Sequence, residues 1–301
     1  MNESPSRSLT VCIVGKPNAG KSTLLNRIIG QKLSIVTPKV QTTRSIITGI
    51  ITLNNTQLVL FDTPGIFEPR KKLEKAMVRC AWSSLNNANL VVLIIDSSTK
   101  LDDTMQDIIE RISATGKKFV VLMNKIDCLS KYYVDHMSMV QKISPTSRIF
   151  NISALKGKGV EDFLTYLQEQ ATHDGWAYEK DDITNLPARF LASEITREQL
   201  FLQLHQELPY NLTVEYEKWQ ENKDGSVKIN QVIIVSRDSH KNIIIGNKGS
   251  KIKEIGSIAR QNIEKLLGQK VHLFLFVSVK PNWAQNPEMY HNMGLKLLPN
   301  D

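Results

Sequence analysis

The residues Gly15-Lys16-Pro17-Asn18-Ala19-Gly20-Lys21-Ser22, GKPNAGKS, decide the fold that this sequence predicts. They fit the pattern G-x-x-x-x-G-K-[ST] and lie between an apolar run at residues 9–14 and a helix-period segment at residues 21–29. In that context a glycine-rich turn presents backbone N–H groups and a helix N-terminus to phosphate oxygens. Chance produces such a string in about one chain of this length in a hundred. The stretch therefore predicts a phosphate-binding loop.

Each polar residue of this loop has a chemical role in the prediction. Lys21 neutralises the β- and γ-phosphates, and the Ser22 hydroxyl ligates Mg²⁺. Thr23, in the first turn of the helix, completes the phosphate-binding set that begins at Gly15.

On both sides of this loop, short apolar runs alternate with helix-period segments, which is typical of a mostly parallel sheet with helices on both faces. The Asn54-Asn55 turn predicts that one edge pair is antiparallel. The predicted strands are residues 9–14, 46–53, 57–61, 90–95, 118–123 and 148–152. The predicted helices are residues 21–29, 73–85, 102–114, 131–143 and 160–170.

Two polar loops in this region supply further ligands for a nucleotide triphosphate. The residues Asp62-Thr63-Pro64-Gly65 follow a strand, where the carboxylate can hold Mg²⁺ through water and the Gly65 N–H can contact the γ-phosphate. Thr42-Thr43-Arg44 precedes the second strand, where a threonine hydroxyl can complete the magnesium shell. The predicted metal ligands are Ser22, Thr43 and Asp62.

Two further strand ends predict that the base is guanine. In Asn124-Lys125-Ile126-Asp127, the Asp127 carboxylate can accept hydrogen bonds from guanine N1–H and N2, whereas adenine would leave it unpaired. Asn124 would brace the loop, and the Lys125 stem would lie along the purine. In Ser153-Ala154-Leu155, the Ala154 N–H can bond guanine O6. Together these elements predict a GTP-binding domain.

The residue that positions the attacking water is not evident. Small signalling G proteins commonly have a glutamine directly after the D-x-x-G glycine, but Ile66 stands there. Asn18 is either a ligand for a monovalent cation such as K⁺ or the cap of a turn, and the sequence favours neither. The predicted catalytic set is Lys21, Thr43, Gly65 and Asn18.

The second half of the chain predicts a different, RNA-binding domain. Gly246-Asn247-Lys248-Gly249 follows three isoleucines and precedes a long helix, so its backbone can approach a phosphodiester beside an apolar groove. Residues 237–280 contain nine basic and three acidic residues. Trp219, Trp283 and Phe274 are expected to pack in the core or between the domains rather than to form platforms on which bases stack. The predicted RNA contacts are Lys241, Ile244, Gly246, Asn247, Lys248, Gly249, Lys251 and Lys253.

The elements of this half read helix, strand, strand, helix, helix, strand. They are residues 188–206, 213–220, 226–235, 239–245, 250–267 and 270–279. We therefore expect a GTP-binding domain at residues 6–172, a linker at 173–187, the RNA-binding domain at 188–281 and a tail at 282–301, on the surface or mobile.

Composition excludes several classes of protein. The 301 residues contain 41% apolar and 23% charged side chains, as globular proteins do. The longest apolar run, residues 90–95, is far shorter than the roughly 20 residues of a membrane span. The three cysteines show no metal-ligand spacing, and the N-terminus has no secretory core, so we expect a cytoplasmic protein. The net charge of +8 predicts a polyanionic partner.

The motifs GKPNAGKS, QTTR, DTPG, NKID, SAL and IIGNKG, in this order, closely resemble the Era family of bacterial GTPases. The resemblance implies an α/β P-loop GTPase domain followed by an α+β type II KH domain. It also implies GTP/GDP and Mg²⁺ as ligands, and small-subunit ribosomal RNA, near its 3′ end, as the partner on the assembling subunit. Family members carry a hydrophobic residue at the position of Ile66, and Asn18 matches an asparagine associated with K⁺. Peripheral association with the inner membrane is implied by the resemblance alone.

Other functions fit parts of the sequence. A signalling GTPase could dock its basic second domain on an anionic membrane or a protein partner. A passive RNA-binding protein with a structural nucleotide is disfavoured by the intact loop Gln41–Arg44 and the Asp62–Gly65 element. We expect a monomeric molecular switch that hydrolyses GTP.

Overall fold

The computed structural model describes residues 6–128, 130–296 and 298, and these form two compact units. The first unit holds residues 6–34, 43–128, 130–185 and 298, and the second holds residues 35–42 and 186–296.

The sheet of the first unit has the order β2-β3-β1-β4-β5-β6. Every neighbouring pair is parallel except β2 with β3, which is the antiparallel edge pair that the Asn54-Asn55 turn predicts. This arrangement confirms the predicted fold class. The strands are β1 (Arg7–Val14), β2 (Ile47–Leu53), β3 (Thr56–Asp62), β4 (Leu90–Asp96), β5 (Phe119–Asn124) and β6 (Arg148–Asn151).

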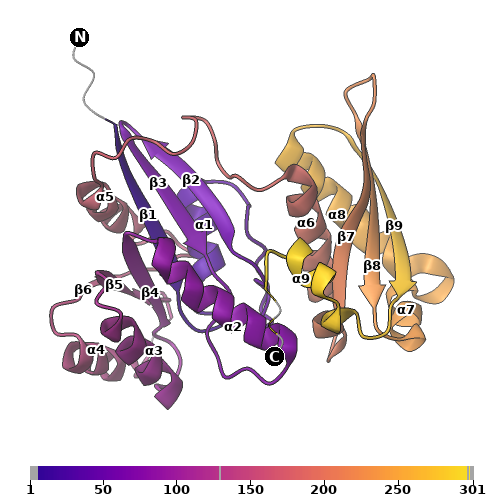
Figure 1. Ribbon diagram of the computed structural model, residues 1–301. Coiled ribbons are helices and arrows are strands. Elements are labelled where there is room, and N and C mark those ends of the chain that lie inside the picture. Colours follow the sequence, from indigo (N-terminus) through magenta and orange to yellow (C-terminus); the bar gives the residue numbers. More distant parts are fainter. Residues whose placement is uncertain (1–5, 129, 297, 299–301) are drawn as a thin grey trace, which may run out of the picture. The chain divides into compact units, whose positions relative to one another are not determined.

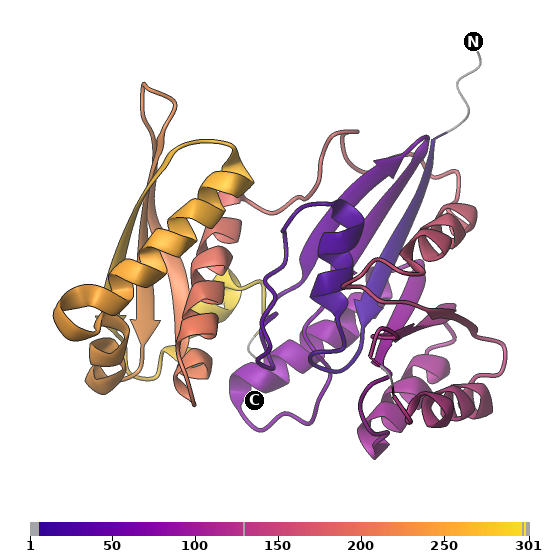
Figure 2. The same cartoon turned by 180° about the vertical axis from the view of Figure 1, so that it is seen from behind.

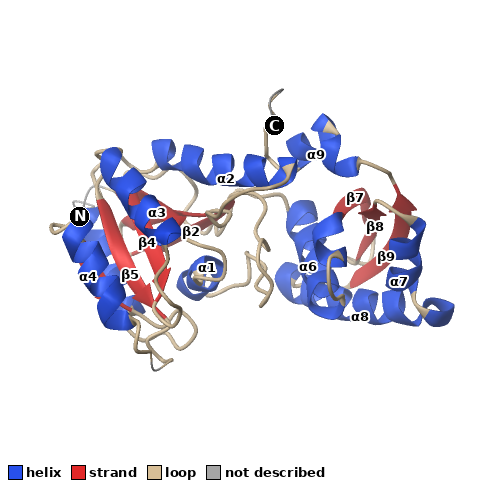
Figure 3. Ribbon diagram, turned by 90° about the horizontal axis from the view of Figure 1, so that it is seen from below, coloured by secondary structure: helices blue, strands red, loops and turns tan. Residues whose placement is uncertain are grey.

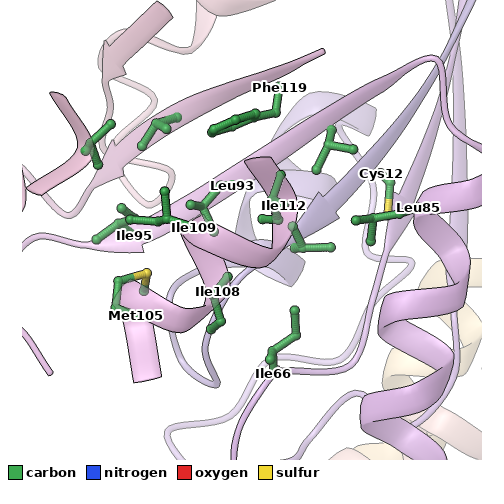
Figure 4. Packing of buried hydrophobic residues seen from close by; sticks show 14 of the residues in the cluster. Cys12, Ile66, Leu85, Leu93, Ile95, Met105, Ile108, Ile109, Ile112 and Phe119 are labelled. Carbon is green, nitrogen blue, oxygen red and sulfur yellow. The ribbon is translucent and has the colours of Figure 1, made fainter. Parts of the chain in front are cut away.

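Helices cover both faces of this sheet. The apolar sides of α2, α3 and α4 pack in one cluster with alternate residues of β1, β4 and β5. Its members include Cys12 of β1, Leu93 of β4 and Ile109 of α3 (Figure 4). Helix α1 lies on the opposite face (Figures 1 and 2). The helices are α1 (Lys21–Ile29), α2 (Lys72–Ser84), η1 (Leu85–Asn87), α3 (Asp103–Ala114), α4 (Tyr133–Ile143) and α5 (Val160–Gln170).

The second unit is a sheet of order β7-β8-β9, in which β7 and β8 are antiparallel and β8 and β9 are parallel. Helices α6 and α8 lie on one face of this sheet, and the short helix α9 lies on the other (Figures 1 and 3). The elements are α6 (Ala188–Gln203), η2 (Leu208–Asn211), β7 (Leu212–Glu221), β8 (Val227–Val235), α7 (Asp238–Ile245), η3 (Asn247–Gly249), α8 (Ser250–Leu267), β9 (Val271–Val279), η4 (Trp283–Gln285) and α9 (Pro287–Asn292). The predicted order of elements is thus observed.

The segment predicted as a linker is fastened to the edge of the first sheet. The Ile50 N–H donates to Ile183 O at 2.8 Å, and the Thr184 hydroxyl donates to Thr48 O at 2.6 Å. The Gln57 side chain bonds the backbone of Ala177 and Tyr178. Residues 173–185 accordingly cluster with the first unit.

The described part of the tail also packs. Trp283 and Tyr290 are buried, and the indole N–H of Trp283 donates to Asn211 O at 3.3 Å. Trp283 therefore packs inside, as expected, and Trp219 is half-buried against the core. No helix in the described part of the chain has the length and hydropathy needed to cross a bilayer.

The loop between α1 and β2 differs from expectation, because residues 35–42 belong to the second unit. The Val36 N–H donates to the Glu198 carboxylate at 2.9 Å. The Lys39 ammonium donates to the carbonyl oxygens of Phe201 and Leu204, at the C-terminal end of α6. A cation at that end of a helix satisfies carbonyls that lack an intrahelical partner.

Candidate nucleotide site and RNA groove

The loop Gly15–Ser22 connects the buried strand β1 to the N-terminus of α1, as predicted. Gly20 adopts φ 103°, and a Cβ atom there would lie 2.2 Å from Nδ2 of Asn124. Glycine is therefore required both by the backbone conformation and by the approach of the neighbouring loop. The resulting turn leaves the first N–H groups of α1 without intrahelical partners, as an anion site needs.

Lys21 is buried at the centre of this loop. Its ammonium donates to Gly15 O at 3.1 Å and to Lys16 O at 2.9 Å. Burial lowers the pKa of Lys21 to about 8, and the nearby Asp62 carboxylate opposes that shift. Phosphate oxygens placed in the loop would give this desolvated cation a stronger partner than two carbonyl groups.

The three predicted metal ligands lie together. The Ser22 hydroxyl is 3.0 Å from the Thr43 hydroxyl and donates to Oδ2 of Asp62 at 2.6 Å. Asp62 is fully buried, and burial raises its pKa. Its Oδ1 has no hydrogen-bond partner among the described residues. An oxygen-only donor set with a spare buried carboxylate oxygen fits Mg²⁺ and its bound water.

Sequence reasoning missed Ser34 at this cluster. The Ser34 side chain is 1% exposed, and its hydroxyl donates to Oδ2 of Asp62 at 2.6 Å. No motif marks Ser34, because it lies in an irregular loop whose path only tertiary structure fixes.

Two further residues make contacts near the phosphate loop, and one predicted residue lies away from it. The Thr63 hydroxyl donates to Ile13 O at 2.8 Å, so it fastens the Asp62–Gly65 segment to β1. The Lys16 ammonium pairs with Asp102, which the sequence did not suggest. Thr42 does not join the metal cluster. It belongs to the second unit, where its hydroxyl is 2.8 Å from that of Thr37.

Asn124 joins the loops that surround the nucleotide site. Its Nδ2 donates to Ala19 O at 2.7 Å, and its Oδ1 accepts from the Ala154 N–H at 2.9 Å. Asn124 is 2% exposed, so both bonds are buried. The predicted bracing role therefore has a concrete form, because one amide connects the phosphate loop to the Ser153–Leu155 loop.

Asp127 is exposed beside this brace, where a base can reach its carboxylate. A hydrogen bond from Ser153 holds the pKa of Asp127 below its usual value, so the carboxylate stays charged. The Lys125 ammonium is 2.5 Å from Asp96 at the end of β4, which holds the lysine stem in place. Ile126 is fixed by its N–H, which donates to Ile152 O at 3.3 Å.

The Ser153–Leu155 loop has a second support that the sequence did not reveal. The Arg27 guanidinium, from α1, donates to Ala154 O at 3.2 Å and also to Leu155 O. The Leu155 side chain is exposed, so its contribution at this position is through the backbone.

The Ile66 side chain carries no group that can hydrogen-bond a water molecule. Its side chain is 4% exposed and packs with Cys12, Leu85 and Ile108 in the apolar cluster (Figure 4). Its N–H donates to Gly15 O at 3.0 Å, which brings the Asp62–Gly65 segment against the phosphate loop. Asn18, by contrast, is exposed and has φ 60°, at the outer turn of that loop.

The second unit contains a groove of about 1110 Å³ beside the predicted glycine loop. Ile243, Gly246 and Lys251 line one part of it. Gly246 has φ 71°, and a Cβ there would lie 2.6 Å from Cβ of Lys251, so the tight turn into α8 needs glycine. The sequence did not suggest the other lining residues, which include Gln206, Asn211 and Asn282.

One predicted RNA contact is wrong. Ile244 is fully buried in the core with Leu200 and Ile255, because the helical period of α7 turns it inward. Its neighbour Ile243 is 56% exposed and lines the groove instead.

The remaining predicted contacts are accessible to different degrees. Asn247, Lys248 and Lys253 are exposed, and Lys241, Gly249 and Lys251 are half-buried. The Lys251 ammonium lies 3.3 Å from Glu254. Lys248 has φ 49°, so its side chain projects from a turn rather than from a helix.

Two family descriptions match the chain, one in each unit. The family described as "50S ribosome-binding GTPase" matches residues 10–125, and the family described as "KH domain" matches residues 207–284. The second match contains the glycine loop and most of the residues that line its groove.

Relatives match nearly the whole chain. The GTPase Era of Rickettsia conorii is 58% identical over 97% of this chain and 86% of its own length. The GTPase Era of Brucella suis is 47% identical over 96% of this chain and 94% of its own length. Among solved structures, Era in complex with MgGDPNP and nucleotides 1506–1542 of 16S ribosomal RNA has a TM-score of 0.90 at 36% identity, covering 96% of this chain and 99% of that one. A point variant of Aquifex aeolicus Era, bound to GDP and AlF4⁻, gives the same values.

Proposed function

Because the chain belongs to the Era family of GTPases, we propose that it binds single-stranded RNA at the 3′ end of small-subunit ribosomal RNA and assists assembly of that subunit. As a GTPase of this family it binds and hydrolyses GTP. The observation that carries the RNA proposal is the glycine loop Gly246–Gly249 beside a wide groove in the KH unit. A relative of the same fold has been crystallised with 16S ribosomal RNA, which supports the choice of partner.

The proposed nucleotide contacts follow the geometry of the first unit. Residues 15–23 hold the phosphates, with Lys21 as the buried cation. Ser22, Thr43 and Asp62 hold Mg²⁺, which supplies charge neutralisation at the β- and γ-phosphates when bound. Asn124 keeps the loops in register, and Asp127 reads guanine.

Reversing the charge of Lys248 tests the RNA proposal. The variant Lys248→Asp is expected to lose most cross-links to small-subunit ribosomal RNA in cells, because its side chain projects from the loop that approaches the phosphodiester. In vitro, the slope of log affinity against log salt concentration should fall by about 1. Aspartate tolerates the left-handed backbone at this position, so the loop should keep its shape.

The matched control is Lys223→Asp, which makes the same charge change at an exposed position in the β7–β8 turn. It should leave RNA cross-links unchanged. Equal cross-linking by Lys248→Asp and the wild type would contradict the role of the glycine loop.

A monovalent cation at Asn18 is part of the proposal. The exposed side chain at the outer turn of the phosphate loop can offer an amide oxygen to K⁺ near the phosphates. Replacing K⁺ by Na⁺ should lower wild-type turnover by about 10²-fold, the scale of removing one electrostatic stabiliser of a transition state. Asn18→Ala should turn over slowly in both salts while binding GTP normally. Persistent stimulation of Asn18→Ala by K⁺ would show that another group holds the ion.

The remaining parts of the proposal concern the oligomeric state of the protein and its location in the cell. We propose a monomer in the cytoplasm, and a peripheral association with the inner membrane rests on the family resemblance alone.

A further inference from the structure

The sheet of the second unit exposes two aromatic side chains on the face away from α6 and α8. Leu273 and Leu275 of β9 pack against the helices. Successive side chains of a strand point to opposite faces. Phe274 and Phe276 therefore lie on the other face, where they are 46% and 51% exposed. We call this face the outer face, and its positions in the pairing register include Lys218, Lys228, Asn230, Val232, Phe274 and Phe276.

This exposure contradicts the sequence expectation that Phe274 packs inside the protein. Residues 273–276 of the strand alternate between leucine and phenylalanine, so both faces of this stretch read as apolar. Isolated exposed apolar residues need no explanation, whereas two phenylalanines on adjacent positions of one face form a patch.

Helix α9 does not cover this patch. It packs on the same side of the sheet through the buried residues Met289 and Tyr290, and Asn292 donates to the Glu215 carboxylate at 2.9 Å. Glu215 belongs to β7, whereas the two phenylalanines belong to β9, at the opposite edge of the sheet (Figure 1). The exposed fractions of Phe274 and Phe276 are those that remain with α9 in place.

Basic side chains adjoin the patch. The Lys228 ammonium lies 5.2 Å from the centroid of the Phe274 ring. His272 is the register partner of Lys228, and Lys218 is the partner of Asn230, which itself pairs with Phe274. Aromatic faces beside cations that can reach phosphates are the combination with which proteins bind unstacked bases.

We propose that Phe274 and Phe276 form a stacking platform for bases of single-stranded RNA, separate from the groove at Gly246–Gly249. The two residues are neighbours on one face of a strand that rises about 3.3 Å per residue, so their Cα atoms are about 6.6 Å apart and each ring can receive one base. Lys228 contributes a cation to the phosphate beside the base on Phe274.

RNA fits this patch better than a protein partner does. A stable protein interface buries about 1,200 Å² or more in total, which two phenylalanines cannot supply. The platform also lies near the glycine loop, because β9 is an edge strand and is contacted by α7, the helix that enters that loop. A single strand leaving the groove can cross that edge and reach the outer face. The platform thus rests on the proposed RNA-binding function and extends it.

The test compares RNAs of two lengths on the full-length protein. A fluorescent RNA of about four nucleotides fills only the length that a KH glycine loop clamps, and one of about 12 nucleotides can also reach the platform. Both sequences come from the 3′ end of 16S ribosomal RNA. The variant Phe274→Leu with Phe276→Leu keeps the apolar area and removes the aromatic faces. We expect it to weaken binding of the longer RNA about tenfold and to leave the shorter RNA unaffected.

Two control variants and a cross-linking measurement distinguish loss of the platform from damage to the groove. Leu202→Ala removes an exposed apolar side chain from α6 and should bind both RNAs as the wild type does. Lys248→Asp should weaken both RNAs. With 4-thiouridine in the longer RNA, the cross-linked peptide should contain residues 271–279.

The proposal is overturned if the leucine pair binds the longer RNA with wild-type affinity, which would assign the patch to a protein or membrane contact. Equal weakening of both RNAs would also overturn it, since that result indicates a distorted groove. If the wild type binds neither RNA, the RNA function itself fails. If Lys248→Asp alone has an effect, the groove stands and the platform does not.

Discussion

Asp127→Asn is expected to lower the affinity for GTP by about three orders of magnitude and to create affinity for xanthosine triphosphate. The Asp127 carboxylate accepts two hydrogen bonds from guanine in the proposed complex. An amide would oppose one guanine donor with its own N–H, and discrimination from such mismatches reaches about 10⁴-fold. Xanthine offers an acceptor at position 2, which the amide N–H can satisfy. Titration calorimetry with both nucleotides measures the exchange.

The control for this prediction is Asp181→Asn, which changes an exposed carboxylate in the segment that follows α5. It should leave both affinities unchanged. Retained preference for guanine in Asp127→Asn would refute the base assignment, because no other change in that variant could restore the lost acceptor.

Asn124→Ala should have the second largest effect, on nucleotide binding and on stability together. The change leaves Ala19 O and the Ala154 N–H without their side-chain partner in a buried site. Each buried group left unsatisfied costs about 1–3 kcal/mol. We expect the first unit to lose about 2–6 kcal/mol of stability and its affinity for GTP and GDP to fall at least tenfold.

Denaturant unfolding of the nucleotide-free protein and a fluorescent GDP titration measure the two effects. Asn87→Ala, at an exposed position of η1, is the matched control and should change neither quantity. A variant that binds GDP normally but unfolds early would show that Asn124 only stabilises the fold and does not organise the site.

The motifs of the proposed nucleotide site could be located from the sequence because their chemistry is local. A strand end followed by a fixed motif determines both the residue types and their backbone geometry, as at Gly20 and Asn124. The first and last residues of α1, α5 and α8 were also predicted correctly. Glycine stands next to both ends of α1 and α8 and directly before α5.

The wrong and missed predictions share a physical cause. Position along the chain does not specify which face of a helix or sheet the rest of the protein covers. Ile244 and Ile243 are chemically identical, and only the packing of α7 decides that Ile244 is buried. Phe274 reads as a core residue because no sequence signal shows that the helix on that face of its sheet, α9, leaves β9 uncovered. Ser34 and Arg27 support the site from loops and helix faces that no motif includes.

The fastening of residues 173–185 along β2 has a consequence for solubility. Strand β2 is the edge of its sheet, and unpaired edge groups are templates for pairing between molecules. The Ile50 N–H and the Thr48 carbonyl are hydrogen-bonded to Ile183 and Thr184, so a strand of another molecule cannot pair at these positions. A GTPase fragment cut at residue 172 would lose this cover, whereas one extended to residue 185 keeps its edge protected from aggregation.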